Sequence, residues 1–197
     1  MAQLGEEELT LSREQAFPFF LAGGLDLTGA ALVARGETEA GLERMREGAR
    51  LYRAAGVEVG RAHLSHLAQV LLDTDHVEEA LAVVADALAR SPAGGERVYW
   101  AELYRIKGEA LLRQNAPDAA AACFRDAIAL ARQQGARVFE LRAATSLVRL
   151  EHQGTSARDA LAACCAWFTE GLDLADVRAA QTLLTAPTFP SPPAAAR

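Results

Sequence analysis

The chain has 197 residues, of which 51% are hydrophobic and 23% charged, as in an ordinary globular protein. Its net charge of −6 argues against a nucleic-acid-binding protein, which needs a concentrated basic face. The acidic start of the chain is unlike a secretion signal, and the most apolar run, residues 16–34, is interrupted by a proline, an aspartate and three glycines. We therefore expect a cytoplasmic protein without a membrane span, whose three cysteines are reduced.

Alanine and leucine dominate the sequence and aromatic residues make up 6% of it, which favours helices over strands. Residues 6–15 resemble the end of a helix. They are either the tail of a repeat whose first half is missing, as in the C-terminal part of a longer solenoid, or a solitary N-terminal capping helix.

The rest of the chain predicts four helix pairs and a final helix. The pairs span about residues 18–56, 60–92, 97–135 and 138–170. Their best-defined helices cover residues 18–35, 39–55, 61–72, 77–90, 98–113 and 117–134. A capping helix at 173–185 completes a repeat domain of residues 1–185, and the proline- and alanine-rich segment 186–197 is expected to be a disordered tail.

Particular residues mark the expected ends of these helices. Gly36 breaks the first pair, and Gly135 suits a C-cap because glycine readily adopts the left-handed backbone conformation. Asp75 and Asp173 are expected to be N-caps, since a short carboxylate can accept hydrogen bonds from the first free N–H groups of a helix. The segment SPAGGE, residues 91–96, predicts a loop.

The third pair carries a recognisable repeat pattern. Small and large residues stand at offsets 4, 8, 11, 20, 24 and 27 of a register that starts at Ala101, namely Tyr104, Gly108, Leu111, Ala120, Phe124 and Ala127. This is the tetratricopeptide register, in which small residues allow two helices to cross closely. Equivalent starts at Ala22, Arg61 and Leu141 give a period of 39 to 40 residues, the length of HEAT-type repeats, but the spacing and Pro92 favour the tetratricopeptide type. We expect an all-α, right-handed tetratricopeptide-like solenoid.

Catalytic and metal-binding patterns are weak. His63 and His66 are three residues apart and share a helix face, as metal ligands can, but no nearby cysteine or carboxylate completes a ligand set convincingly. The cysteines fit small core residues better than nucleophiles, and neither a phosphate-binding glycine loop nor a serine-nucleophile motif occurs. We expect a protein that is not an enzyme, with no metal and no cofactor.

The most promising functional surface is the concave groove that the first helices of such repeats would line. Positions expected to face it are Gln69, Glu102, Arg105, Glu109, Arg142, Thr145, Arg149 and His152, and the apolar Leu112 falls at an equivalent helical offset. Three arginines therefore converge in an otherwise acidic protein, and arginine presents a planar fork suited to carboxylates. We hypothesise that this half of the groove binds an acidic peptide segment or a chain terminus. The alternative is a solvated face partly neutralised by Glu102 and Glu109.

Three segments, AELYRIKGEALL (101–112), ACFRDAIALARQQGARVFELRAATSLVRL (122–150) and WFTEGLDLADVRAAQTLL (167–184), resemble one protein family. The resemblance, which SREQAFPFFLAGG (12–24) shares, is to the C-terminal tetratricopeptide region of large bacterial signalling proteins. In these proteins an adenylate/guanylate cyclase domain or a DNA-binding regulator domain precedes a signal-transducing ATPase. Asp26, Leu27 and the proline-rich tail depart from the pattern of these relatives.

The resemblance implies a helical sensor or interaction region and brings no active site, because the cyclase and ATPase motifs belong to domains that this sequence does not include. We therefore expect a non-catalytic module for protein–protein interaction in signal transduction, whose partner is a protein or peptide. The alternative is a fragment of such a signalling protein that senses a small ligand. A third reading is a homodimer formed through the N-terminal repeat face.

The glycine content of the first pair predicts uneven stability along the chain. Each glycine inside a helix costs about 1 kcal/mol relative to alanine, so residues 29–48 should unfold more readily than residues 108–127. Hydrogen exchange would test this prediction, and equal protection of the two segments would contradict it.

Overall fold

The computed structural model describes residues 10–12, 17–55, 60–89, 99–151 and 155–186. Within these ranges helices are the only regular secondary structure, which confirms the all-α prediction. The chain divides into two compact units, Met1–Tyr99 and Trp100–Arg197. Residues 10–12 of the expected N-terminal helix are helical, whereas the predicted loop 91–96 and the tail from residue 187 lie outside the described residues.

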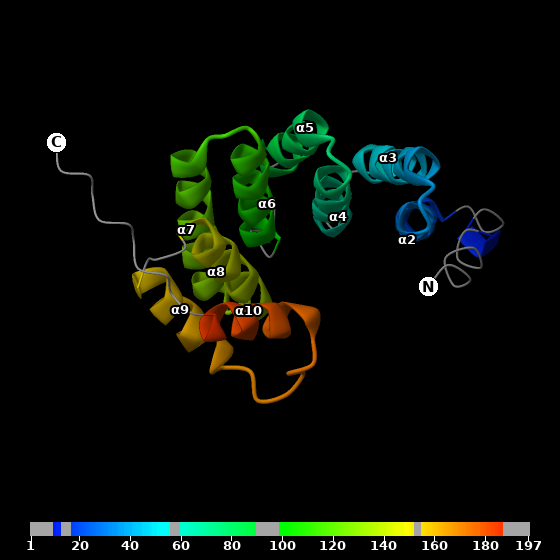
Figure 1. Ribbon diagram of the computed structural model, residues 1–197. Helices are drawn as coiled ribbons and strands as arrows, with labels where there is room; N and C mark the ends of the chain where they lie inside the picture. Colours follow the sequence, from blue (N-terminus) through cyan, green and yellow to red (C-terminus); the bar gives the residue numbers. More distant parts are fainter. Residues whose placement is uncertain (1–9, 13–16, 56–59, 90–98, 152–154, 187–197) are drawn as a thin grey trace. The chain divides into compact units, whose positions relative to one another are not determined.

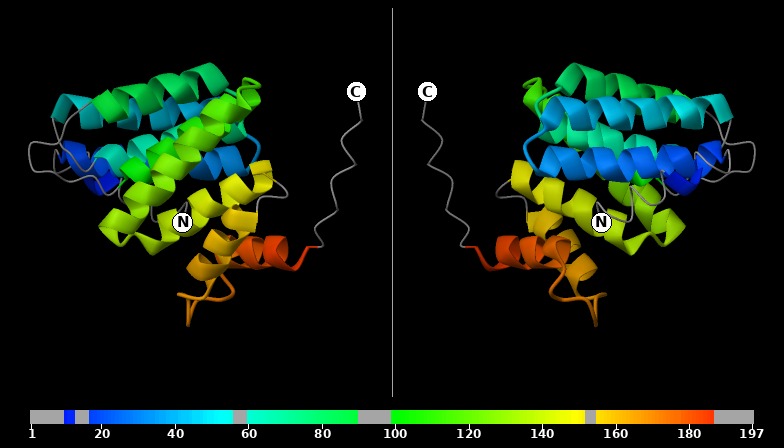
Figure 2. Two further views of the ribbon diagram at one scale, coloured as in Figure 1. Left: turned by 90° about the vertical axis from the view of Figure 1, so that its left-hand side faces the viewer. Right: turned by 90° about the vertical axis from the view of Figure 1, so that its right-hand side faces the viewer.

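The first unit contains two neighbouring helix pairs among its described residues. Its helices are α2 (Pro18–Ala34), α3 (Thr38–Ala55), α4 (Gly60–Asp73) and α5 (Val77–Ala89). Helix α2 packs along α3, and α4 packs against α5 (Figures 1 and 2). Leu42 and Met45 of α3 and Leu71 and Val84 of the second pair are fully buried, so each pair contributes to the apolar interior of this unit.

The second unit contains a further pair, a third helix beside it and two helices that follow. These are α6 (Trp100–Arg113), α7 (Pro117–Gln134), α8 (Arg137–Glu151), α9 (Thr155–Cys165) and α10 (Ala175–Thr185). Phe124, Leu141 and Leu161 form the centre of one apolar core, and Tyr104 and Leu111 pack against it from α6. Helix α10 lies against α8 and α9, where it buries Val177 and Ala180 (Figure 1).

Three turns within the helix pairs have the same geometry. Gly36, Asp75 and Asn115 have φ angles of 89°, 67° and 59°, and they lie 39 and 40 residues apart. In each turn the N–H of the next residue donates to a carbonyl five residues earlier, from Glu37 to Leu32, from His76 to Leu71 and from Ala116 to Leu111. This hydrogen bond closes the C-terminus of a helix in the Schellman manner. The same device therefore ends the first helix of three successive pairs.

The structure confirms one predicted cap and corrects two. Gly135 ends α7 with a left-handed φ of 67°, as expected. Asp75 is not an N-cap: it occupies the left-handed position of its turn, which aspartate tolerates better than most residues, and α5 begins at Val77. Asp173 is not an N-cap either, because the turn in which Leu174 N–H donates to Gly171 moves the start of α10, so that Leu174 takes the cap position.

Small residues let the helices of two pairs approach closely. A Cβ atom on Gly29 of α2 would lie 2.6 Å from the Gly41 carbonyl oxygen and 2.6 Å from Met45 of α3. A Cβ atom on Gly108 of α6 would lie 2.5 Å from the ring of Phe124 in α7. Such distances leave no room for a methyl group, so each glycine is required by its neighbour across the pair.

Gly41→Ala should destabilise the protein although alanine favours helix. The new Cβ would lie 2.5 Å from the backbone oxygen of Gly29, which cannot move aside as a side chain can. Overpacking of this kind costs about 1–3 kcal/mol, more than the helix propensity gained. Urea denaturation would measure the free energy of unfolding, with Glu43→Ala on the exposed side of α3 as the control. An unchanged or increased stability of Gly41→Ala would contradict the close approach.

Candidate functional site

A buried ionic network joins three turns of α6 in the second unit. Arg105 is 7% exposed and donates through Nε and Nη2 to the two carboxylate oxygens of Glu102, at 2.9 and 2.7 Å. Its third donor, Nη1, lies 2.6 Å from Oε1 of Glu109. The spacings of three and four residues place these side chains on one face of the helix. The guanidinium of Arg105 is therefore occupied inside the protein.

The network continues into α8 and α10. Arg142 lies 3.3 Å from Glu102 through Nη1 and 2.7 Å from Asp176 through Nε. Ser146 of α8 donates its hydroxyl to Oε1 of Glu109 at 2.9 Å. These contacts hold α8 beside α6 and give Glu102, which is 6% exposed, two arginine partners within the packed unit.

Burial alone would lower the pKa of Arg105, since it disfavours the charged form. The hydrogen bonds and negative charge of Glu102, followed by those of Glu109, outweigh burial and hold the pKa of Arg105 above its ordinary value. Arg105 thus stays charged at physiological pH, and the network acts as a structural scaffold.

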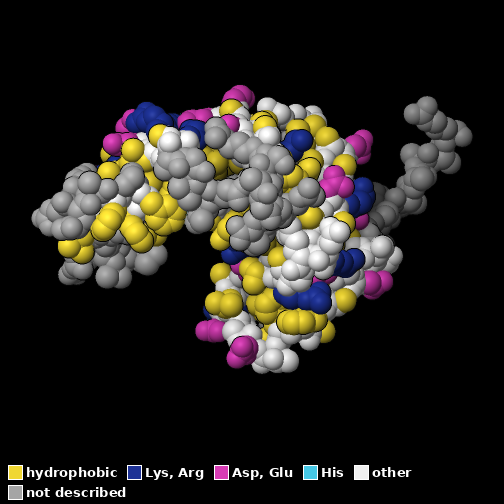
Figure 3. All heavy atoms as spheres, turned by 180° about the vertical axis from the view of Figure 1, so that it is seen from behind, with side chains coloured by type: hydrophobic (Ala, Val, Ile, Leu, Met, Phe, Trp, Pro, Cys, Tyr) yellow, Lys and Arg dark blue, Asp and Glu magenta, His cyan; other side chains and the backbone are white. Residues whose placement is uncertain are grey.

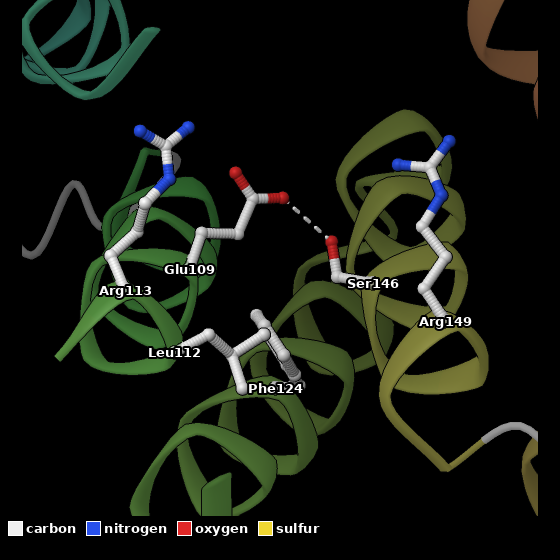
Figure 4. A pocket seen from close by; sticks show the side chains of 6 residues that line it. All are labelled: Glu109, Leu112, Arg113, Phe124, Ser146 and Arg149. Atoms are coloured by element: carbon white, nitrogen blue, oxygen red, sulfur yellow. Dashed lines mark hydrogen bonds between the residues drawn. The ribbon is translucent and has the colours of Figure 1, made fainter. Parts of the chain in front are cut away.

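A pocket of about 420 Å³ opens beside this scaffold. It is lined by Glu109, Leu112, Arg113, Phe124, Ser146 and Arg149. Figure 4 shows Arg113 from α6 and Arg149 from α8 on opposite sides of the opening, with Leu112 and Phe124 at the base. Both arginines stand in the last turn of their helices, where the helix dipole favours a positive charge. The pocket therefore combines two cations with an apolar floor.

The structure distributes the predicted groove residues among different roles. Glu109 and Arg149 line the pocket, whereas Glu102, Arg105 and Arg142 belong to the network beside it. Thr145 is buried and donates to the Leu141 carbonyl of its own helix at 2.7 Å. Gln69 lies in the first unit and donates to Asp73, and His152 lies outside the described residues.

Four lining residues were not predicted from the sequence as parts of a site. Phe124 was predicted only as a packing residue, and Leu112 as a groove position without a ligand role. Arg113 and Ser146 each follow a predicted groove position directly in the sequence. A wider helical face, extended by one residue on each side, would have included both, because a side chain covers more of the surface than a single offset assigns.

The cysteine thiols are poor nucleophiles. Burial, followed by the charge of Glu140, raises the pKa of Cys164 to about 12, and burial raises the pKa of Cys123 and Cys165 above the ordinary value. Among the described residues, no group of three or more histidine, cysteine, aspartate or glutamate side chains has the arrangement of a metal site. No described helix has the length and apolarity needed to cross a bilayer.

The charge pattern of the surface is mixed. On the face of the described residues that Figure 3 shows, lysine and arginine side chains are scattered among acidic and hydrophobic ones.

Compared with models of known protein families and with curated proteins, the sequence matches none of them. The pocket and its network are thus the features from which a function can be argued.

Arg105→Leu should strongly destabilise the second unit. Its removal leaves Glu102 buried beside a single, more distant cation, and breaking a buried ion pair on one side costs about 3–5 kcal/mol. Arg149→Leu is the matched control, because Arg149 is exposed and should change stability by less than about 0.5 kcal/mol. Denaturant titration followed by circular dichroism measures both. Equal effects of the two substitutions would show that the network carries no structural role.

Proposed function

We propose that the protein is a non-catalytic interaction module that binds a carboxylate-bearing peptide segment or chain terminus of a partner protein. The observation that carries this proposal is the pair of arginines, Arg113 and Arg149, on either side of a pocket with an apolar floor. A carboxylate that enters between two guanidinium groups can accept several charge-assisted hydrogen bonds. An apolar side chain on the same peptide would then lie against Leu112 and Phe124.

The hydrogen bonds that the Glu109 carboxylate already accepts within the protein support the choice of an anionic ligand. Glu109 is the only acidic residue among those that line the pocket, and Oε1 of its carboxylate already accepts from Arg105 and Ser146. Its negative charge is therefore offset from within, and Arg113 and Arg149 lie on either side of the opening (Figure 4).

We further propose that the helix pairs are tetratricopeptide-like repeats of a right-handed solenoid. The identical turns at Gly36, Asp75 and Asn115 support this proposal, because they recur at the period that the sequence predicts. The resemblance to the C-terminal region of bacterial cyclase and ATPase signalling proteins would then place the module in signal transduction. Binding of a protein segment is the use that such repeats commonly serve.

A small-ligand sensor is the second candidate. The pocket volume of about 420 Å³ falls within the roughly 300–1,000 Å³ of typical small-molecule sites. The cation pair would again select a carboxylate, so the two candidates share the ligand chemistry and differ in how far the ligand extends beyond the pocket.

Fluorescence anisotropy with defined peptides tests the proposal. The probes are labelled heptapeptides with an apolar residue beside aspartate or glutamate, and the same peptides with asparagine or glutamine instead. We expect the acidic set to bind and Arg113→Glu/Arg149→Glu to weaken it at least about tenfold, or about 1.4 kcal/mol. Arg35→Glu/Arg178→Glu, which reverses two exposed arginines that do not line the pocket, is the control matched for net charge.

The outcomes separate the candidates. Equal binding of acidic and amidated peptides, or full binding by the double variant, would refute the arginine site. Binding of free N-acetylated acidic amino acids as tightly as of the heptapeptides would favour the small-ligand sensor.

A further inference from the structure

A single buried carboxylate stands out in the first unit. Helix α2 has 17 residues, and Asp26 is the only charged one among them. Its residue exposure is 4%, although a buried carboxylate needs partners that compensate for the loss of water. The sequence had marked Asp26 only as a departure from the pattern of related repeats. The structure shows what it contacts.

Two histidines of α4 converge on this carboxylate. The Nδ1 atoms of His63 and His66 each lie 2.9 Å from the same oxygen, Oδ2 of Asp26. The histidines are three residues apart, so both rings project from one face of α4. Tyr52 of α3 stacks on the ring of His63, with centroids 4.4 Å apart and an angle of 14° between the planes. Helices α2, α3 and α4 therefore meet at one polar cluster.

Among the described residues, the other charged contacts between the two helix pairs are arginine–carboxylate pairs, with one exception. Arg46 of α3 forms two hydrogen bonds of 2.8 Å with Glu79 of α5, and Arg53 lies 2.8 Å from Asp86. The exception is His76, which lies 3.6 Å from Glu39 at the exposed end of α3. Since histidine is the side chain that normally changes charge between about pH 5 and 8, the three histidines are the groups that can make this unit respond to pH.

We propose that Asp26, His63 and His66 form a proton-dependent clamp, which fastens α2 to α4 when the histidines are protonated and loosens as they lose their protons. A protonated imidazole donates a charge-assisted hydrogen bond to the buried carboxylate. A neutral imidazole can donate only an ordinary one, and it leaves the negative charge of Asp26 uncompensated in the interior.

The directions of the pKa shifts of Asp26 and His66 determine the pH range in which the clamp should loosen. Burial alone would raise the pKa of Asp26, but the hydrogen bonds from His63 and His66 outweigh it and hold that pKa below 3.8. The hydrogen bond to Asp26 outweighs burial at His66 and raises its pKa above 6.5. The contribution of His66 is thus complete below pH 6.5 and is lost as the pH rises through its folded-state pKa. The contribution of Asp26 to stability is lost only as the pH falls through the folded-state pKa of Asp26, which lies below 3.8.

Two measurements on the full chain test the clamp. A titration of the histidine ring protons by NMR should give His66 a pKa above 6.5 in the wild type. Hydrogen-exchange protection factors at about pH 5.5 and about pH 8.5, which bracket the ordinary histidine pKa, should fall for α2 and α4 at the higher pH. Amides of α6 and α7 in the other unit serve as the internal reference and should keep their protection.

Asp26→Asn is the decisive variant, because asparagine keeps the shape and one acceptor oxygen but removes the charge. We expect the His66 pKa to fall to 6.5 or below, because burial then lowers it without an opposing negative charge, and the pH dependence of α2 and α4 protection to disappear. His76→Gln should leave the wild-type response intact. A wild-type His66 pKa at or below 6.5, a response that survives Asp26→Asn, or one that disappears in His76→Gln would overturn the proposal.

Discussion

The close approach of helices within a pair is the constraint on which the rest of the structure depends. In two pairs a glycine of the first helix faces a large side chain of the second, Gly29 with Met45 and Gly108 with Phe124. A helix can lie this near its neighbour only where one surface lacks a Cβ atom. The same contact sets the functional geometry, since Phe124, held against Gly108, also forms the floor of the pocket.

In each unit a buried carboxylate side chain connects neighbouring helices. Asp26 in the first unit and Glu102 in the second are both almost fully buried, and both are held by basic side chains from neighbouring turns or helices. Their partners differ in chemistry. Arg105 stays protonated at any physiological pH, so the network in the second unit is a constant support for the pocket. Histidine is the side chain that ordinarily changes charge between about pH 5 and 8, which is why we propose that the junction in the first unit responds to pH.

The helix ends predicted from the sequence were correct where a single backbone requirement decides which residue can end the helix. Gly36 and Gly135 end helices where expected, because a left-handed φ favours glycine over nearly every other residue. The predictions failed at Asp75 and Asp173, since aspartate suits both an N-cap and a left-handed turn position and nothing local chooses between them. For the candidate site, Glu109 and Arg149, which helical offsets placed on the predicted groove, both line the pocket. The offsets could not reveal that Arg105 is buried against Glu102 or that Arg113 takes part.

The sequence by itself determined that this protein is all-helical, because apolar residues recur at helical spacing and glycines interrupt them between helices. It also determined the period at which the turns recur, since the backbone geometry of each turn is encoded within a few residues. Only the tertiary structure decided which charged side chains face solvent and which face one another. Whether Arg105 and Asp26 are ligand-binding or structural depends on residues from other turns and other helices, and no local pattern specifies those contacts.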